Sequence, residues 1–134
     1  MTEIKKLTKI SLIIIAIVGF LFGTMLVFLY DTTLNFEGWT NPYYPRFFGG
    51  ICYLITIFAI LLLRKKEWEE IKLTFAFLYG FVIPTLIIEI VTTISGMLGS
   101  TLQPSTVLAS LTTTTPLMAV LLVLGIVTYI RQRS

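Results

Sequence analysis

Four long, apolar and almost uncharged stretches limit the folds open to this chain. They cover residues 10–30, 47–63, 73–98 and 107–130. A helix needs roughly 20 apolar residues to cross the hydrocarbon core of a bilayer, and the four stretches approach or exceed that length. Hydrophobic residues form 56% of the 134 residues and charged residues 13%, a balance that leaves little polar surface for water. The sequence therefore predicts an all-α polytopic integral membrane protein: a single transmembrane domain with four helices in an antiparallel up-down bundle.

The basic residues predict how these helices are oriented, because Lys and Arg near the ends of spans stay on the cytoplasmic side. All of them except Arg46 fall on one side of the predicted bundle: Lys5, Lys6, Lys9, Arg64, Lys65, Lys66, Lys72, Arg131 and Arg133. We therefore expect both termini and a loop over residues 64–72 to be cytoplasmic, with an outer loop over residues 31–46. The plasma membrane is the expected location, and the net charge of +3 follows from this topology and does not indicate nucleic-acid binding.

Each predicted loop has one feature of interest. In the cytoplasmic loop, Lys65 with Glu69 and Lys66 with Glu70 have the spacing of ion pairs on a helix. The outer loop is rich in aromatic residues, which either anchor it at the membrane interface or form a lid over a ligand. These residues are Trp39, Tyr43 and Tyr44.

Several chemistries are excluded by composition. The chain has no histidine and a single cysteine, Cys52, so it lacks the ligands of common metal sites and cannot form an intrachain disulfide. It has no glycine-rich phosphate loop and no dinucleotide-binding motif. We expect no metal, no cofactor and no enzymatic activity.

Glu89 is the residue that most needs an explanation, because an acid inside a span is costly and usually faces protein or a wet cavity. At 100° per residue, it shares one face of its helix with threonines, and a second stripe of hydroxyls lies on the last helix. The two stripes form a candidate intramembrane polar site: Thr85, Glu89, Thr92 and Thr93, with Ser110, Thr113 and Thr114. Glu89 either joins the two helices through hydrogen bonds or handles a proton or cation.

Prolines and glycines complete the prediction. Pro84 and Pro116 lie inside helices, where proline removes a backbone hydrogen bond and causes a kink, so we expect a polar pocket between the last two helices. Gly19 and Gly23 form a G-x-x-x-G motif, which brings helices close together either within one bundle or between two copies.

These features favour a small non-catalytic membrane protein, an accessory or assembly subunit of a membrane complex. Its expected partners are the lipid bilayer and other membrane subunits or further copies of itself. The alternative is a small transporter or channel-like protein that moves a proton or cation through Glu89. A third hypothesis, an enzyme acting on lipid, would require Glu89 to share a site with Asp31 or Glu37.

Overall fold

The computed structural model describes residues 2–29, 43–99 and 110–134. Its regular secondary structure there is helical, apart from a single bridge between Glu3 and Glu67. The helices are α1 (Lys6–Val27), α3 (Tyr43–Leu63), α4 (Trp68–Gly80), α5 (Val82–Gly99) and α7 (Thr115–Arg133), with a π-helical turn, η1 (Ser110–Thr114), directly before α7. The prediction of an all-helical chain is confirmed.

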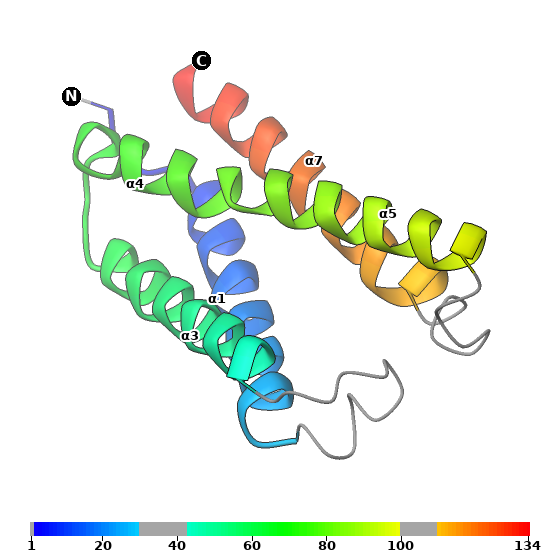
Figure 1. Cartoon of the computed structure of the whole chain (residues 1–134). Coiled ribbons are helices and arrows are strands. Elements are labelled where there is room, and N and C mark those ends of the chain that lie inside the picture. Colours follow the sequence, from blue (N-terminus) through cyan, green and yellow to red (C-terminus); the bar gives the residue numbers. More distant parts are fainter. Residues whose placement is uncertain (1, 30–42, 100–109) are drawn as a thin grey trace.

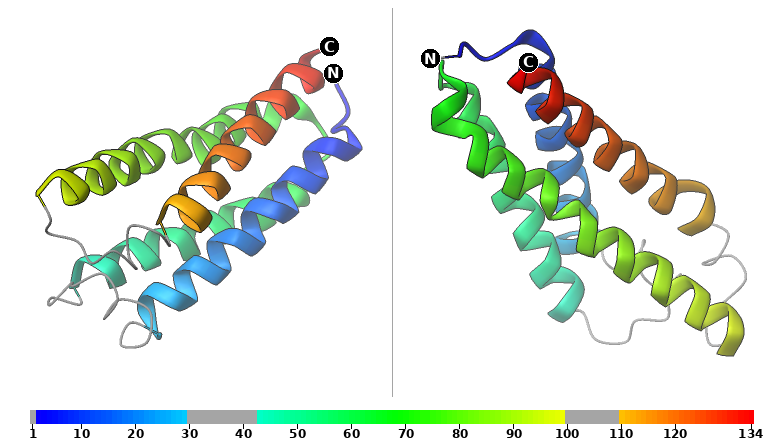
Figure 2. Two further views of the ribbon diagram at one scale, coloured as in Figure 1. Left: turned by 90° about the vertical axis from the view of Figure 1, so that its right-hand side faces the viewer. Right: turned by 90° about the horizontal axis from the view of Figure 1, so that it is seen from above.

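Four segments of the described residues are long and apolar enough to cross a membrane. They are Lys6–Val27, Pro45–Leu63, Trp68–Ser95 and Thr112–Arg133. Many large hydrophobic side chains on them point outward, among them Leu73, Ile88 and Ile130. Both chain termini lie at the same end of the molecule, which we call the terminal end (Figures 1 and 2).

Two helices begin earlier than the sequence indicated. α3 begins at Tyr43, inside the predicted outer loop, because Pro45 fits the first turn of a helix, where its missing N–H is not needed. α4 begins at Trp68, so the connection from α3 covers residues 64–67 and not 64–72. Glu69 and Glu70 occupy the first turn of α4, where negative charge is favourable.

This early start of α4 changes the ion pairs. Lys65 and Lys66 precede the helix, so helical spacing does not relate them to Glu69 and Glu70. Instead, Lys65 Nζ lies 3.2 Å from Glu70 Oε1, and Lys72 pairs with Glu69. The predicted Lys65–Glu69 and Lys66–Glu70 pairs are not the ones that form.

α1 and α3 are in close contact because glycines line their interface. A Cβ added at Gly19 would lie 2.8 Å from the carbonyl oxygen of Cys52, and one added at Gly23 would lie 3.1 Å from that of Gly49. Thr24 Oγ1 and the Tyr53 hydroxyl form a 2.9 Å hydrogen bond across the same interface. The G-x-x-x-G motif thus packs inside the chain's own bundle.

The core lies mainly in the half of the molecule nearest the terminal end. Its fully or nearly fully buried members come from α1, α3 and α4, and include Leu12, Ala59, Ile71, Phe75 and Leu78. Towards the other end, α5 diverges from α1 and α3 and runs beside η1 and α7 (Figures 1 and 2). We call α5, η1 and the beginning of α7 the limb.

Candidate functional site

The predicted stripe on α5 lies partly on the face that packs against the rest of the protein. Val82 and Thr93 are buried on this face, and Thr85 and Glu89 between them are half-buried. Thr92 is exposed. Since α5 contacts both η1 and α7, Glu89 lies on the inward side of the limb, in partial contact with the surroundings.

The predicted stripe on the last helix is less buried. Thr113 is exposed and Thr114 is half-buried, while the side chain of Ser110 lies outside the described residues. The hydroxyl oxygen of Thr115 is instead buried, without a hydrogen-bond partner among the residues that the structure describes. Sequence periodicity missed Thr115 because the π-helical turn shifts the face that each following residue presents.

Both prolines lie near irregular backbone. The helix is interrupted at Phe81, three residues before Pro84, and the Thr85 hydroxyl donates a 2.9 Å hydrogen bond to the Phe81 carbonyl oxygen. The η1 turn ends shortly before Pro116. The Phe81 carbonyl oxygen therefore accepts hydrogen bonds from both the backbone N–H and the hydroxyl of Thr85, beside the interruption.

The cavity beside Thr85 is apolar. It has a volume of about 50 Å³ and lies where the limb diverges from α1 and α3. Thr85 is one of few polar residues in its lining, which includes Phe22, Phe48, Phe81 and Met118. Phe48 and Phe81 stack with their ring centroids 6.2 Å apart. Of the residues predicted to form the polar site, Thr85 alone lines this cavity, so the polar pocket between the last two helices stays a prediction.

A second group of polar side chains is buried at the terminal end, and the sequence analysis did not identify it. We call it the terminal polar cluster, and its members are Thr8, Ser11, Tyr79, Thr128 and Gln132. All of them are 4% exposed or less. They come from α1, α4 and α7, so the cluster joins three helices.

Hydrogen bonds join the members of this cluster in two sets. Gln132 Oε1 accepts from the Thr8 hydroxyl at 2.6 Å and from the Lys5 backbone N–H at 2.9 Å, and Gln132 Nε2 donates to the Glu3 carbonyl oxygen at 2.9 Å. The hydroxyls of Ser11 and Thr128 are 2.6 Å apart. The Tyr79 hydroxyl donates to the Ser11 carbonyl oxygen at 2.6 Å. Buried polar groups that are paired in this way fix the relative positions of helices.

The position of Tyr79 leads to a prediction about Gly125. A Cβ added at Gly125 would lie 2.7 Å from Tyr79 Cγ, and the tyrosine ring cannot move away without breaking its hydrogen bond to Ser11. Gly125→Ala should therefore lower the free energy of unfolding by about 1–3 kcal/mol. Unfolding in mixed detergent micelles measures this value. Gly80→Ala is the control, because no atom lies within 4 Å of an added Cβ there, and an equal loss in both variants would contradict the explanation.

Within the described residues, no group of three or more His, Cys, Asp or Glu side chains could hold a metal ion. Comparison of the chain with protein-family models, with curated proteins and with solved structures gave no match. The functional class has to be inferred from the residues themselves.

Proposed function

We propose that the chain is a multi-pass protein of the plasma membrane with both termini in the cytoplasm, and that it acts as a non-catalytic accessory or assembly subunit. The four apolar helices support the membrane location. The basic residues that gather at the terminal end, Lys5, Lys65 and Arg131 among them, support the orientation.

The observation that carries this proposal is the polar character of the limb. Thr92 and Thr113 are exposed, and Glu89 is only half-buried, on helices where most of the exposed side chains are apolar. A bilayer does not favour such groups at this depth. An apolar helix of another subunit, with hydrogen-bonding side chains level with Thr92 and Thr113, would cover them and gain polar contacts worth about 1 kcal/mol each.

Transport is less well supported by the geometry. A proton or cation pathway needs polar, water-accessible space, whereas the cavity next to Thr85 is apolar and small. The glycines of α1 face α3, so the most obvious close-packing motif is already used inside the bundle. We therefore expect the limb to make the contacts with another subunit.

Site-directed cross-linking in native membranes tests the accessory role. Thr92→Cys or Thr113→Cys, each in a Cys52→Ser background, should cross-link to one other membrane protein. Ile57→Cys is the matched control, since Ile57 is 54% exposed on α3, away from the limb, and it should give no such product.

Three results would overturn the proposal. The first is equal cross-linking from Thr92 and Ile57, which would indicate random encounters in the bilayer. The second is a product made only of two copies of this chain, which would indicate a homo-oligomer. The third is pH-dependent flux through proteoliposomes that Glu89→Gln abolishes, which would indicate a transporter.

A further inference from the structure

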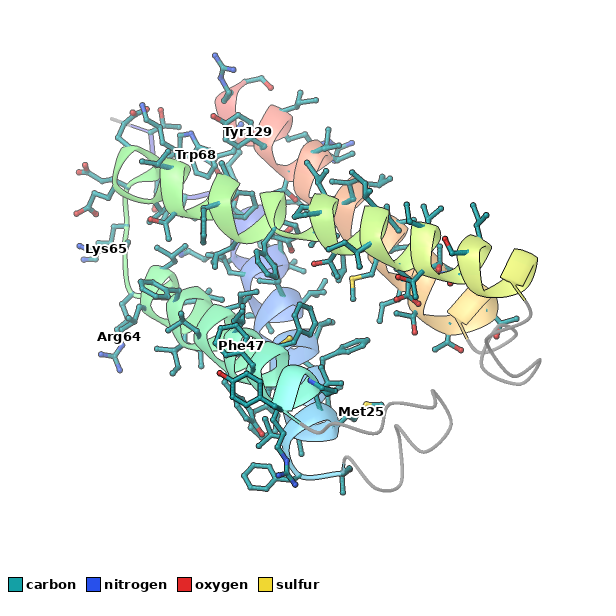
Figure 3. The ribbon with its side chains drawn as sticks, in the orientation of Figure 1. Met25, Phe47, Arg64, Lys65, Trp68 and Tyr129 are labelled. Carbon is teal, nitrogen blue, oxygen red and sulfur yellow. The ribbon has the colours of Figure 1, made fainter. Side chains whose placement is uncertain are left out.

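A pocket of about 320 Å³ lies at the terminal end, between the beginning of α4 and the end of α7. Small-molecule sites usually begin at roughly this size. The residues that line it are Thr2, Trp68, Glu69, Lys72, Tyr129 and Arg133. Figure 3 shows the labelled Trp68 and Tyr129 beside each other on these two helices, with ring centroids 5.4 Å apart.

The rings at this pocket are held firmly in place. Trp68 is 3% exposed and packs edge-on against both Phe75 and Tyr129. Its backbone N–H donates a 2.8 Å hydrogen bond to the Thr2 carbonyl oxygen, which fixes the N-terminal segment across the same region. The pocket thus has a rigid aromatic wall.

The charged groups that line the pocket favour a ligand with a single negative charge. Lys72 and Arg133 are cations and Glu69 is the one acid among the lining side chains. Glu69 pairs with Lys72, and the guanidinium carbon of Arg133 lies 5.9 Å from the centre of the Tyr129 ring. The lining therefore carries one positive charge in excess, which matches one phosphodiester, and Arg can bind phosphate oxygens through two N–H groups.

Apolar residues directly beside the pocket indicate that the phosphate belongs to a lipid. Leu73 lies one helical turn from Glu69 and is 82% exposed, and Ile130 lies just under one turn from Arg133 and is 62% exposed. They directly follow the lining residues Lys72 and Tyr129 in the sequence, and both belong to the apolar spans. A phosphate held by Arg133 would place the acyl chains of its lipid along these two residues.

We propose that this pocket binds the phosphodiester headgroup of an anionic phospholipid, with Arg133 and Lys72 as the binding residues. The proposal rests on the membrane location of the helices but not on the accessory role. A chain with no partner subunit would still bind the lipid.

Native mass spectrometry of the purified protein, titrated with phosphatidylglycerol, tests this site. Arg133→Gln and Lys72→Gln should each weaken binding of the first lipid about fivefold, the effect expected for one basic residue near anionic lipid. Arg133→Lys keeps the charge and should lose less. Arg64→Gln is the control, because Arg64 is an exposed cation of the same end that does not line the pocket.

The outcomes separate the possible sources of the phosphate. Unchanged affinity in Arg133→Gln, or an equal loss in Arg64→Gln, would overturn the site in favour of a diffuse basic rim. Displacement of the lipid by inorganic phosphate at millimolar concentration would show that the pocket binds free phosphate, and would overturn the lipid assignment. Retained melting temperatures in all variants would show that each one is folded.

Discussion

Gly19→Ala is expected to separate α1 from α3 and to destabilise the protein by about 1–3 kcal/mol. The added Cβ would lie 2.6 Å from Thr56 Oγ1 and 2.8 Å from the carbonyl oxygen of Cys52. Neither atom can give way easily. Thr56 Oγ1 donates to the Ala16 carbonyl oxygen at 2.9 Å, and the Cys52 oxygen belongs to the backbone of α3, so the whole helix must shift.

The melting temperature in detergent measures this effect. Gly50→Ala is the matched control, because Gly50 lies on α3 with no atom within 4 Å of an added Cβ. There alanine should leave stability unchanged or raise it by up to about 1 kcal/mol, since it favours the helix. A similar drop in Tm for both variants would show that the α1–α3 contact is not as close as the structure describes.

Gln132→Leu is expected to destabilise the protein at least as much as Gly19→Ala, because it leaves three buried or partly buried groups without their hydrogen bond to Gln132. These are the Thr8 hydroxyl, the Lys5 N–H and the Glu3 carbonyl oxygen. An unsatisfied buried group costs about 1–3 kcal/mol, so the variant should lose several kcal/mol of stability.

Hydrogen exchange locates this loss. The backbone amides of Ile4 and Lys5 should lose protection, because the N-terminal segment is held by Gln132 and by the 3.1 Å bond from Ile4 N–H to the Lys66 carbonyl oxygen. Arg131→Gln is the control, since Arg131 contacts Lys5 Nζ through its backbone carbonyl, which the substitution keeps. Unchanged protection at Lys5 in the leucine variant would argue against the role of Gln132.

The helices could be predicted from the sequence because each belongs to a long run of apolar residues, a simple pattern of length and polarity. Their boundaries were less predictable. Charged or proline-containing segments resemble loops, yet Glu69 and Pro45 are well suited to the first turn of a helix. Periodicity describes the faces of a helix but not where its first hydrogen bond forms.

Glu89 and the terminal polar cluster differ in how easily they can be recognised from the sequence. Glu89 is conspicuous because it is the one charge in a long apolar stretch. The terminal polar cluster is not, because its contacts join residues far apart, such as Ser11 and Thr128. Thr8 and Ser11, and likewise Thr128 and Gln132, have the spacing of residues on one face of a helix. This spacing would have predicted a polar stripe on each helix, but not that the two stripes contact each other.

The bonds from Gln132 to the N-terminal segment have a consequence for biosynthesis. Residues 3, 5 and 8 cannot reach their partner until residue 132, at least 124 positions further along the chain, has left the ribosome. During translation the first hairpin, α1 with α3, must hold together through its own local glycine contacts. Chains halted before the last helix would expose unpaired polar groups near their N-terminus, a difference that quality-control proteases at the membrane could detect.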